Sequence, residues 1–479
     1  MNRKMVFFVL SQLLLAEAGL MLFPFAAALY YREECALALA ASAGTAAAAG
    51  LLIYLLTRSA KTTIYAKEGF VITALSWLIL SAVGALPFYL SGEIPSYVDA
   101  FFETVSGFTT TGASILDNVE AMSRGLLFWR SFTHWVGGMG VLVFVMAITK
   151  KGSDRAIHIM KAEMPGPIVD KLVPKTRDTA KILYIIYLIL TVTEFLFLLA
   201  GGMPVFDSIV HAFGTAGTGG FGIKADSIGS YSPYIQWVIA IFMMLFGVNF
   251  NLYFLVKEKR FRDAVKSTEL RTYLCIILIA SLLIGFDIYH DTGSLADTAR
   301  LSFFQTSSII TTTGFSTADF NAWGTLSKTV IVILMFIGGC AGSTAGGLKV
   351  SRIIIYFKMI KREIKKLLHP RTVSSVRLEG RTVDETTISS QSAYLAVYAA
   401  AFFIILFILA FDEFGFETNF TAVAACFNNI GPGLDKVGPA LSFSGYSAVS
   451  KLALSAGMLL GRLEIFPLLL AFAPSTWKK

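Results

Sequence analysis

Long apolar runs recur along the chain and are separated by polar segments. A helix needs about 20 mostly apolar residues to cross the hydrocarbon core of a bilayer, and these runs are close to that length. The first run carries Glu17 and is too long for the apolar core of a secretory signal, so we interpret it as a retained helix. The pattern predicts ten membrane spans, at residues 7–28, 36–56, 70–90, 126–148, 182–202, 234–256, 272–289, 330–356, 393–411 and 448–472.

Most basic residues fall on one side of the predicted membrane. Segments 150–181, 257–271 and 349–381 contain 8, 6 and 10 lysines and arginines, respectively. With both termini in the cytoplasm these segments are cytoplasmic too, as the positive-inside rule requires, and the opposite side is acidic. The formal net charge of +8 therefore indicates topology, with some attraction to anionic membrane lipid. We expect no nucleic acid partner, because the chain has no soluble basic domain to bind one.

The overall composition agrees with a membrane protein. Apolar residues make up 55% of the chain and charged residues 15%, which disfavours a soluble enzyme and a disordered chain. The four cysteines are scattered in or beside apolar runs, so we expect small buried side chains and neither disulfides nor a zinc site. The spans contain no HExxH motif and no pair of catalytic aspartates. We therefore expect that the protein is not an enzyme.

A short apolar stretch followed by a turn rich in glycine and threonine occurs four times on the acidic side. The copies read FFETVSGFTTTGAS at 101–114, VHAFGTAGTGGFG at 210–222, FFQTSSIITTTGFST at 303–317 and FTAVAACFNNIGPG at 420–433. One glycine aligns all four copies, at Gly112, Gly220, Gly314 and Gly431. The spacings of 108, 94 and 117 residues fit a repeating unit of span, short helix, turn and span.

Four such turns in one register favour a pore over ordinary tight turns between helices. Non-helical backbone at membrane depth is tolerated only where protein buries it or water reaches it. Rings of backbone carbonyls can replace the water around a cation, and glycine keeps side chains out of the ion's path. Each short helix ends at its turn, so the negative end of its dipole would also favour a cation. The candidate cation-binding residues are Thr110, Thr111, Gly112, Thr218, Gly219, Gly220, Thr312, Thr313, Gly314, Asn429, Ile430 and Gly431.

These turn segments resemble the four filter segments of the TrkH/KtrB potassium transporter family. The matching sequences are TTTGA, GTGGFG, TTTGFST and NNIGPGL, while WVGGMG, GGCAGSTAGGLK and GRLEIF resemble the helices after the filters. The resemblance covers residues 65–475. It implies an all-α integral membrane protein with four pseudo-repeated M1–pore helix–M2 units around a central pore, plus two N-terminal transmembrane helices as in the TrkH branch. We place the two extra helices at 1–68 and the four units at 69–150, 151–257, 258–360 and 361–479.

The same resemblance implies a cargo and partners. All four filter positions hold glycine, which implies K+ as the transported ion, with no organic cofactor in this chain. The resemblance further implies that the protein forms a homodimer in the bacterial inner membrane. It also implies that a cytoplasmic TrkA-type nucleotide-binding ring regulates it. A Na+-permeable pore, or a secondary transporter coupled to H+ or Na+ by symport, is the alternative. An inverted-repeat transporter is disfavoured, because each unit begins and ends on the same side.

The predicted span at 330–356 contains five glycines in its middle, each of which disfavours a continuous helix by about 1 kcal/mol. Close helix packing is one interpretation, and an intramembrane loop below the filter is the other, for which the resemblance implies a gate. Arg462 lies near the middle of the last span, where an arginine must face protein or water. We expect it to reach this loop and raise the barrier to cations; an ion pair with a carboxylate such as Glu194 is the alternative. The candidate gate residues are Gly338, Gly339, Gly342, Ser343, Thr344, Gly346, Gly347, Lys349 and Arg462.

Other polar residues receive simpler interpretations. We expect Glu103 to act as a structural hydrogen-bond acceptor and Arg130 to face the outer funnel or pair with an acid there. His134 is expected to pack within the protein. The basic segment 349–381 is either the docking site of the regulator or a plain cytoplasmic loop.

Overall fold

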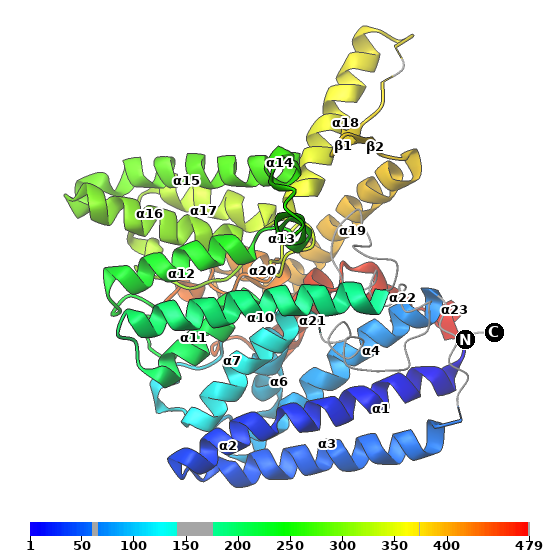
Figure 1. The fold of residues 1–479 in the computed structure, drawn as a ribbon, viewed down its shortest axis with the longest axis vertical. Helices are drawn as coiled ribbons and strands as arrows, with labels where there is room; N and C mark the ends of the chain where they lie inside the picture. The colour runs from blue at the N-terminus through cyan, green and yellow to red at the C-terminus, as the bar shows by residue number, and fades with distance from the viewer. Residues whose placement is uncertain (60–65, 141–175, 373, 478–479) are drawn as a thin grey trace.

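The first two predicted spans form a helical hairpin along one edge of the molecule, at the bottom of Figure 1. Close packing holds the hairpin together, because a Cβ on Gly50 would lie 3.0 Å from Cγ of Leu15. The hairpin consists of α1 (Arg3–Leu20), α2 (Leu22–Tyr31) and α3 (Cys35–Thr57). The structure is a computed structural model, and the residues that it describes are 1–59, 66–140, 176–372 and 374–477.

The rest of the chain repeats one arrangement four times. In each unit a long outer helix is followed by a short pore helix, a turn and an inner helix. The outer helices are α4 (Ala66–Gly84), α10 (Thr176–Ala200), α15 (Thr268–Thr292) and α19 (Glu385–Leu409). The pore helices are α6 (Tyr97–Phe108), α11 (Val205–Gly217), α16 (Leu295–Ile310) and α20 (Phe416–Phe427). The inner helices are α7 (Arg124–Gly138), α12 (Pro233–Phe246), α17 (Thr325–Ile337) and α21 (Ala448–Arg462).

Shorter elements join or extend these helices. Among the described residues, strands β1 and β2 pair antiparallel, with Arg377 opposite Thr382. The remaining elements are α5 (Leu86–Leu90), η1 (Val119–Ala121), α13 (Phe250–Lys257), α14 (Phe261–Lys266), η3 (Phe320–Ala322), α18 (Val350–Leu368), β1 (Arg377–Leu378), β2 (Arg381–Thr382), η4 (Asp435–Val437), α22 (Phe466–Phe472) and α23 (Pro474–Trp477). The boundaries between the units, placed at residues 68, 150, 257 and 360, remain predictions.

The outer helices are apolar on the face that packs inward and on the face that points away from the protein. On α15, Tyr273, Ile277 and Ile284 are buried, whereas Phe286 on the outer face is 80% exposed. A helix that is apolar all round suits a lipid environment. The prediction that all four cysteines are buried is therefore wrong for Cys275, which is exposed on this outer face. An apolar run alone does not tell which of its residues face lipid.

Two predicted spans are not continuous helices. The inner helix of the second unit bends by 90° between α12 and α13, and that of the fourth bends by 120° between α21 and α22. Asn249 begins α13 by accepting a hydrogen bond from the Asn251 amide. Glu464 and Ile465 both have positive φ, so the helix cannot continue through them. Six described helices are long and apolar enough to cross a membrane, or up to eight if each bent pair is counted as one span.

The glycine-rich span at 330–356 is also interrupted, as its composition predicts. Residues 338–349 form a non-helical loop between α17 and α18. The end of the predicted span at 126–148 and most of the basic segment 150–181 lie outside the described residues.

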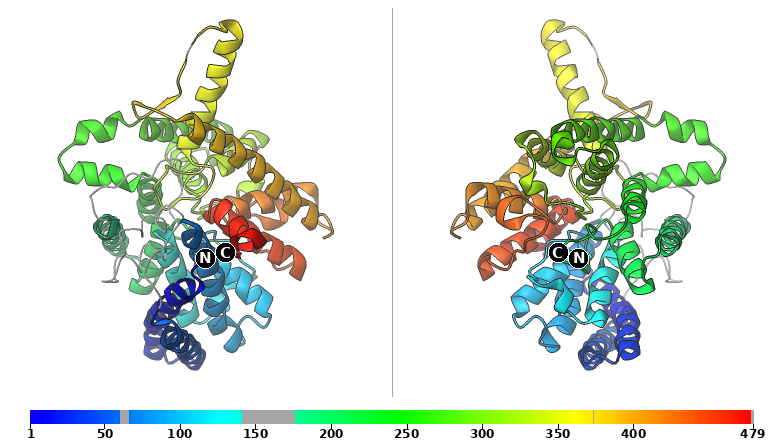
Figure 2. Two further views of the ribbon diagram at one scale, coloured as in Figure 1. Left: turned by 90° about the vertical axis from the view of Figure 1, so that its right-hand side faces the viewer. Right: turned by 90° about the vertical axis from the view of Figure 1, so that its left-hand side faces the viewer.

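One helix extends away from the body of the molecule. Figure 1 and both views of Figure 2 show α18 projecting at the end opposite the N-terminal hairpin. Phe357, Ile364 and Leu367 are exposed along this amphipathic helix. The two ends of the chain lie side by side in Figure 2, where Arg3 donates a hydrogen bond to the carbonyl of Trp477 at 3.3 Å.

Candidate functional site

The four pore helices end in the same way. In each, the amide of the residue before the aligned glycine bonds to the carbonyl five residues earlier, as in Thr111 to Ser106 at 2.8 Å and Thr313 to Ser308 at 2.9 Å. This bond and the left-handed residue before it define a Schellman-type helix end. The left-handed residues are Thr110, Thr218, Thr312 and Asn429, with φ between 55° and 57°. Left-handed backbone is unusual for threonine, so the surrounding protein must hold these turns in place.

The four aligned glycines form a closed ring through the turns. A Cβ on Gly112 would lie within 3.0 Å of the Gly219 carbonyl oxygen, so the first turn meets the second. By the same criterion the second meets the third, the third meets the fourth, and the fourth meets the first. The remaining pairs are Gly220 with Thr313, Gly314 with Ile430 and Gly431 with Thr111. All four glycines have positive φ, from 75° to 101°, so glycine is required both by conformation and by space.

Hydroxyl and amide groups brace the ring from behind. The hydroxyls of Thr109 and Thr111 lie 2.8 Å apart, and those of Thr311 and Thr313 form the same pair at 2.8 Å. In the fourth turn Asn429 donates to the Thr111 hydroxyl at 3.0 Å. The second turn has glycine at both equivalent positions and so lacks this pair of side chains. The structure thus brings all twelve candidate cation-binding residues together.

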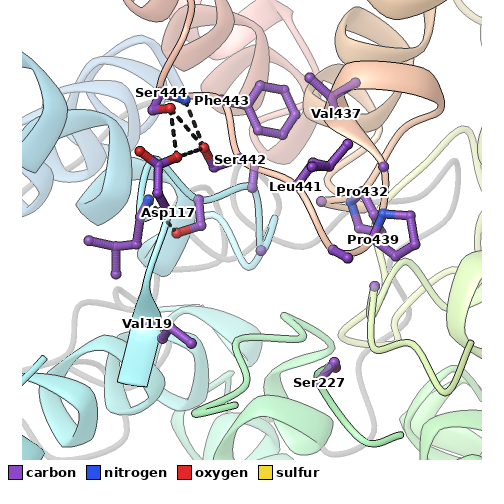
Figure 3. A pocket seen from close by; sticks show the side chains of 18 of the residues that line it. Asp117, Val119, Ser227, Pro432, Val437, Pro439, Leu441, Ser442, Phe443 and Ser444 are labelled. Carbon is purple, nitrogen blue, oxygen red and sulfur yellow. Dashed lines mark hydrogen bonds between the residues drawn. The ribbon is translucent and has the colours of Figure 1, made fainter. Parts of the chain in front are cut away.

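A cavity of about 490 Å³ opens beside the ring and includes all four aligned glycines in its lining. Figure 3 shows Asp117 on one side of this cavity, with Pro432, Pro439 and Leu441 across from it. Hydrogen bonds from Ser442 and Ser444 lower the pKa of Asp117, so its carboxylate stays ionised. Lys224 also lines the cavity, so the mouth carries charges of both signs.

Glu103 and Arg130 form an ion pair at the wall of the cavity, which Arg130 lines. Nε of Arg130 lies 2.6 Å from the carboxylate of Glu103, which also accepts from the Ser114 hydroxyl at 3.0 Å and the Ile115 amide at 2.9 Å. Arg130 donates as well to the carbonyl of Gly222 at 3.0 Å. The pair joins the segments that follow the first two turns. The predicted roles of both residues agree with these contacts.

The loop at 338–349 contacts the third and fourth turns. The amide of Gly346 donates to the hydroxyl of Thr312 at 2.6 Å, and a Cβ on Gly346 would lie 2.5 Å from the carbonyl oxygen of Asn428. At its other end the loop contacts the bend between α12 and α13, because the backbone amide of Cys340 donates to the carbonyl of Gly247 at 3.0 Å. Among the candidate gate residues, Gly346 therefore lies directly against the third and fourth turns.

Arg462 connects this loop to the first unit. It donates to the carbonyls of Thr344 at 2.8 Å, Gly137 at 2.7 Å and Gly138 at 2.6 Å. Lys349 is buried beside it and donates to the carbonyl of Ala345. The alternative ion pair with Glu194 is not formed, because both carboxylate oxygens of Glu194 lack a hydrogen-bond partner within the described residues.

Sequence reasoning missed Glu269, which holds the loop from the N-terminal end of α15. Its carboxylate accepts from the amides of Ala341 at 2.7 Å and Ser351 at 3.1 Å. The backbone of Glu269 is held in turn by Glu379, whose carboxylate accepts from its amide at 3.0 Å. The sequence signal at Glu269 is an acid in the first turn of a helix, which predicts only a local dipole effect.

Comparison with known proteins places this architecture in a family of membrane proteins. A family model named TrkH and described as a cation transport protein matches residues 39–479. The chain is 38% identical to the Trk system potassium uptake protein TrkH of Salmonella typhimurium, over 98% of each chain. It is 33% identical to the Trk system potassium uptake protein TrkG of Escherichia coli K12, over 96% of this chain and 95% of that protein.

A solved structure gives the same result. The crystal structure of the potassium transporter TrkH from Vibrio parahaemolyticus matches with a TM-score of 0.90 and 32% identity, over 100% of both chains. The fold is that of a membrane-embedded cation transport protein, and the predicted fold class is confirmed. The chain belongs to the TrkH family.

Proposed function

We propose that this protein takes up potassium ions across the bacterial inner membrane through the ring of four turns. The observation that supports the proposal is the closed contact cycle of the four aligned glycines, in which the glycine of each unit lies beside a backbone carbonyl of the next unit. Carbonyl oxygens arranged in this way can replace the hydration shell of a cation. The relatives named as potassium uptake proteins support K+ as the cargo.

The possible ligands for a cation at the ring of four turns are oxygen atoms. Within the described part of the chain no group of three His, Cys, Asp or Glu residues converges on a possible metal site. We propose that the backbone carbonyls of the twelve filter residues, from Thr110 to Gly431, bind the ion, while the hydroxyls of Thr111 and Thr313 support the ring from behind. The pore helices end at the same turns, so their carbonyl ends add negative potential there.

Cation flux into liposomes that contain the purified protein tests this function. We expect uptake of K+ and Rb+ to exceed that of Na+ when each gradient is applied alone. Equal K+ and Na+ flux would support the sodium-permeable alternative. Potassium flux that requires a proton or sodium gradient would instead support symport.

We further propose that the loop at 338–349, Lys349 and Arg462 form the gate of this pore. The loop contacts the third and fourth turns, and two cationic side chains are buried beside it. Positive charge close to a narrow pathway opposes the passage of cations by Coulomb repulsion, most strongly where water is scarce. Arg462 also holds Thr344 in place, so it contributes both charge and position.

Replacing Arg462 by alanine is expected to raise potassium flux. The substitution removes a buried charge and frees the carbonyl of Thr344. A gain of about tenfold corresponds to a barrier lower by about 1.4 kcal/mol. The initial rate of Rb+ uptake into liposomes measures it.

Arg462→Lys is the matched control. Lysine keeps the positive charge but lacks the guanidinium donors that reach three carbonyls. We therefore expect the potassium flux through Arg462→Lys to be higher than that of the wild type and lower than that of Arg462→Ala. Unchanged flux through Arg462→Ala, in a protein that elutes as a single folded species, would contradict a gating role.

We also propose a homodimer and a cytoplasmic TrkA-type ring as partners. The relatives are named as parts of a Trk system, which supports association with other subunits. The exposed apolar side chains of α18, flanked by Lys358, Lys361 and Lys365, provide a surface that extends beyond the body of this chain (Figure 1). The mass of the purified protein in detergent, measured by light scattering, tests the dimer.

A further inference from the structure

The second filter turn differs from the other three in what supports it. In the first and third turns, paired threonine hydroxyls lie behind the ring. At the equivalent positions the second turn has Gly217 and Gly219, so it has no side chain of its own there. With Gly220, three of its four residues are glycines, which allow the most backbone freedom.

His134 occupies the space that these side chains would fill, with its imidazole at Gly219 and its backbone carbonyl at Gly217. A Cβ on Gly219 would overlap ring atoms of His134, and those ring atoms are its nearest neighbours. A Cβ on Gly217 would overlap the backbone carbonyl of His134. His134 belongs to α7, so a residue of the first unit supports the turn of the second.

The surroundings of His134 show that it packs without a polar partner. Its side chain is fully buried, and neither ring nitrogen has a hydrogen-bond partner within the described residues. Its ring meets the ring of Phe221 edge-on, with centroids 4.1 Å apart. Phe221 directly follows Gly220, so the imidazole touches the turn on both sides of the aligned glycine.

The fourth unit uses an apolar residue at the matching place. A Cβ on Gly137 would overlap the carbonyl oxygen of Phe108, and a Cβ on Gly461 would overlap that of Phe427. The two glycines are therefore equivalent, and three residues before each stand His134 and Met458. Met458 contacts its turn through its backbone carbonyl, which accepts a hydrogen bond from Asn429 at 2.9 Å. His134 instead contacts the second turn with its imidazole ring.

We infer that His134 is a selectivity-determining positioning residue, which replaces the missing side chains of the second turn and fixes the carbonyl of Gly219. That carbonyl is the atom that faces Gly112 in the ring. Without the imidazole, the glycine-rich turn can relax and its oxygens can approach the smaller sodium ion. The inference rests on the proposed potassium function of the ring.

A set of paired substitutions tests this role. We expect His134→Ala to keep potassium flux and to lower the ratio of Rb+ to Na+ uptake by about tenfold. Gly219→Thr is expected to disrupt the protein, because the new side chain overlaps the imidazole. His134→Ala combined with Gly219→Thr recreates the side chain found in the first and third turns, so folding and selectivity should both return.

Gly217→Ala is the matched control, since its Cβ would overlap backbone and His134→Ala should not rescue it. An unchanged uptake ratio in His134→Ala would overturn the inference, as would equal damage by Gly219→Thr with and without the imidazole. Melting temperatures of the same variants report the rescue independently of flux. A wild-type protein that does not prefer K+ would contradict the proposed function, whereas the thermal rescue would still test the packing.

Discussion

Replacing Gly314 by serine is expected to abolish most of the discrimination between potassium and sodium. Gly314 has a φ of 85°, and a Cβ there would lie 2.9 Å from Cδ of Pro432 and even closer to the carbonyl oxygen of Ile430. The third and fourth turns would have to separate, and the carbonyl ring would lose its spacing. We expect the ratio of Rb+ to Na+ uptake to fall by about tenfold or more, which is about 1.4 kcal/mol of discrimination.

Gly92→Ser provides a control for backbone strain. Gly92 also has a positive φ, of 77°, but nothing lies within 4 Å of the place its Cβ would take. Both substitutions therefore carry the conformational cost of a left-handed residue, and only the one in the ring displaces a neighbouring turn. If Gly314→Ser kept the uptake ratio of the wild type, the ring would not be the selectivity filter.

Deleting residues 339–346 is expected to raise potassium flux by about tenfold or more, equivalent to a barrier lower by at least about 1.4 kcal/mol. The deletion joins residues that already lie together, because a Cβ on Gly338 would be 2.9 Å from Cα of Gly347. It removes the contact between Gly346 and Thr312 and the carbonyl of Thr344 that Arg462 holds. The initial rate of Rb+ uptake measures the change.

The same deletion in the Gly314→Ser background serves as its control. If the added flux passes through the ring, the double variant should conduct both K+ and Na+ readily. A deletion that folds as a single species but conducts no better than the wild type would show that this loop is not the barrier.

The long outer helices were predictable because hydropathy reports transfer into lipid. The predicted spans at 36–56 and 272–289 lie inside α3 and α15, and the span at 393–411 overlaps α19 up to the end of that helix at Leu409. The bends after Phe246 and Arg462 were not predicted, since each lies within a longer apolar run that hydropathy reads as one span. Short-range features cause these breaks, including the cap by Asn249 and the positive φ of Glu464.

The amino-acid sequence was sufficient to show that four glycine-containing turns exist and that each follows a short helix. Helix ends and left-handed glycines depend on neighbours within a few residues, and such signals can be read along the chain. The interruption of the span at 330–356 was predictable for the same reason, because its glycines disfavour a continuous helix locally.

The tertiary structure alone decided how these turns meet. The contact between Gly431 and Thr111 joins residues at opposite ends of the chain, and the support of Gly219 by His134 crosses two units. The three carbonyls that accept hydrogen bonds from Arg462, and the two amides that donate to Glu269, also come from distant segments. Such partners are chosen by close packing in three dimensions, for which hydropathy and local conformation carry no signal.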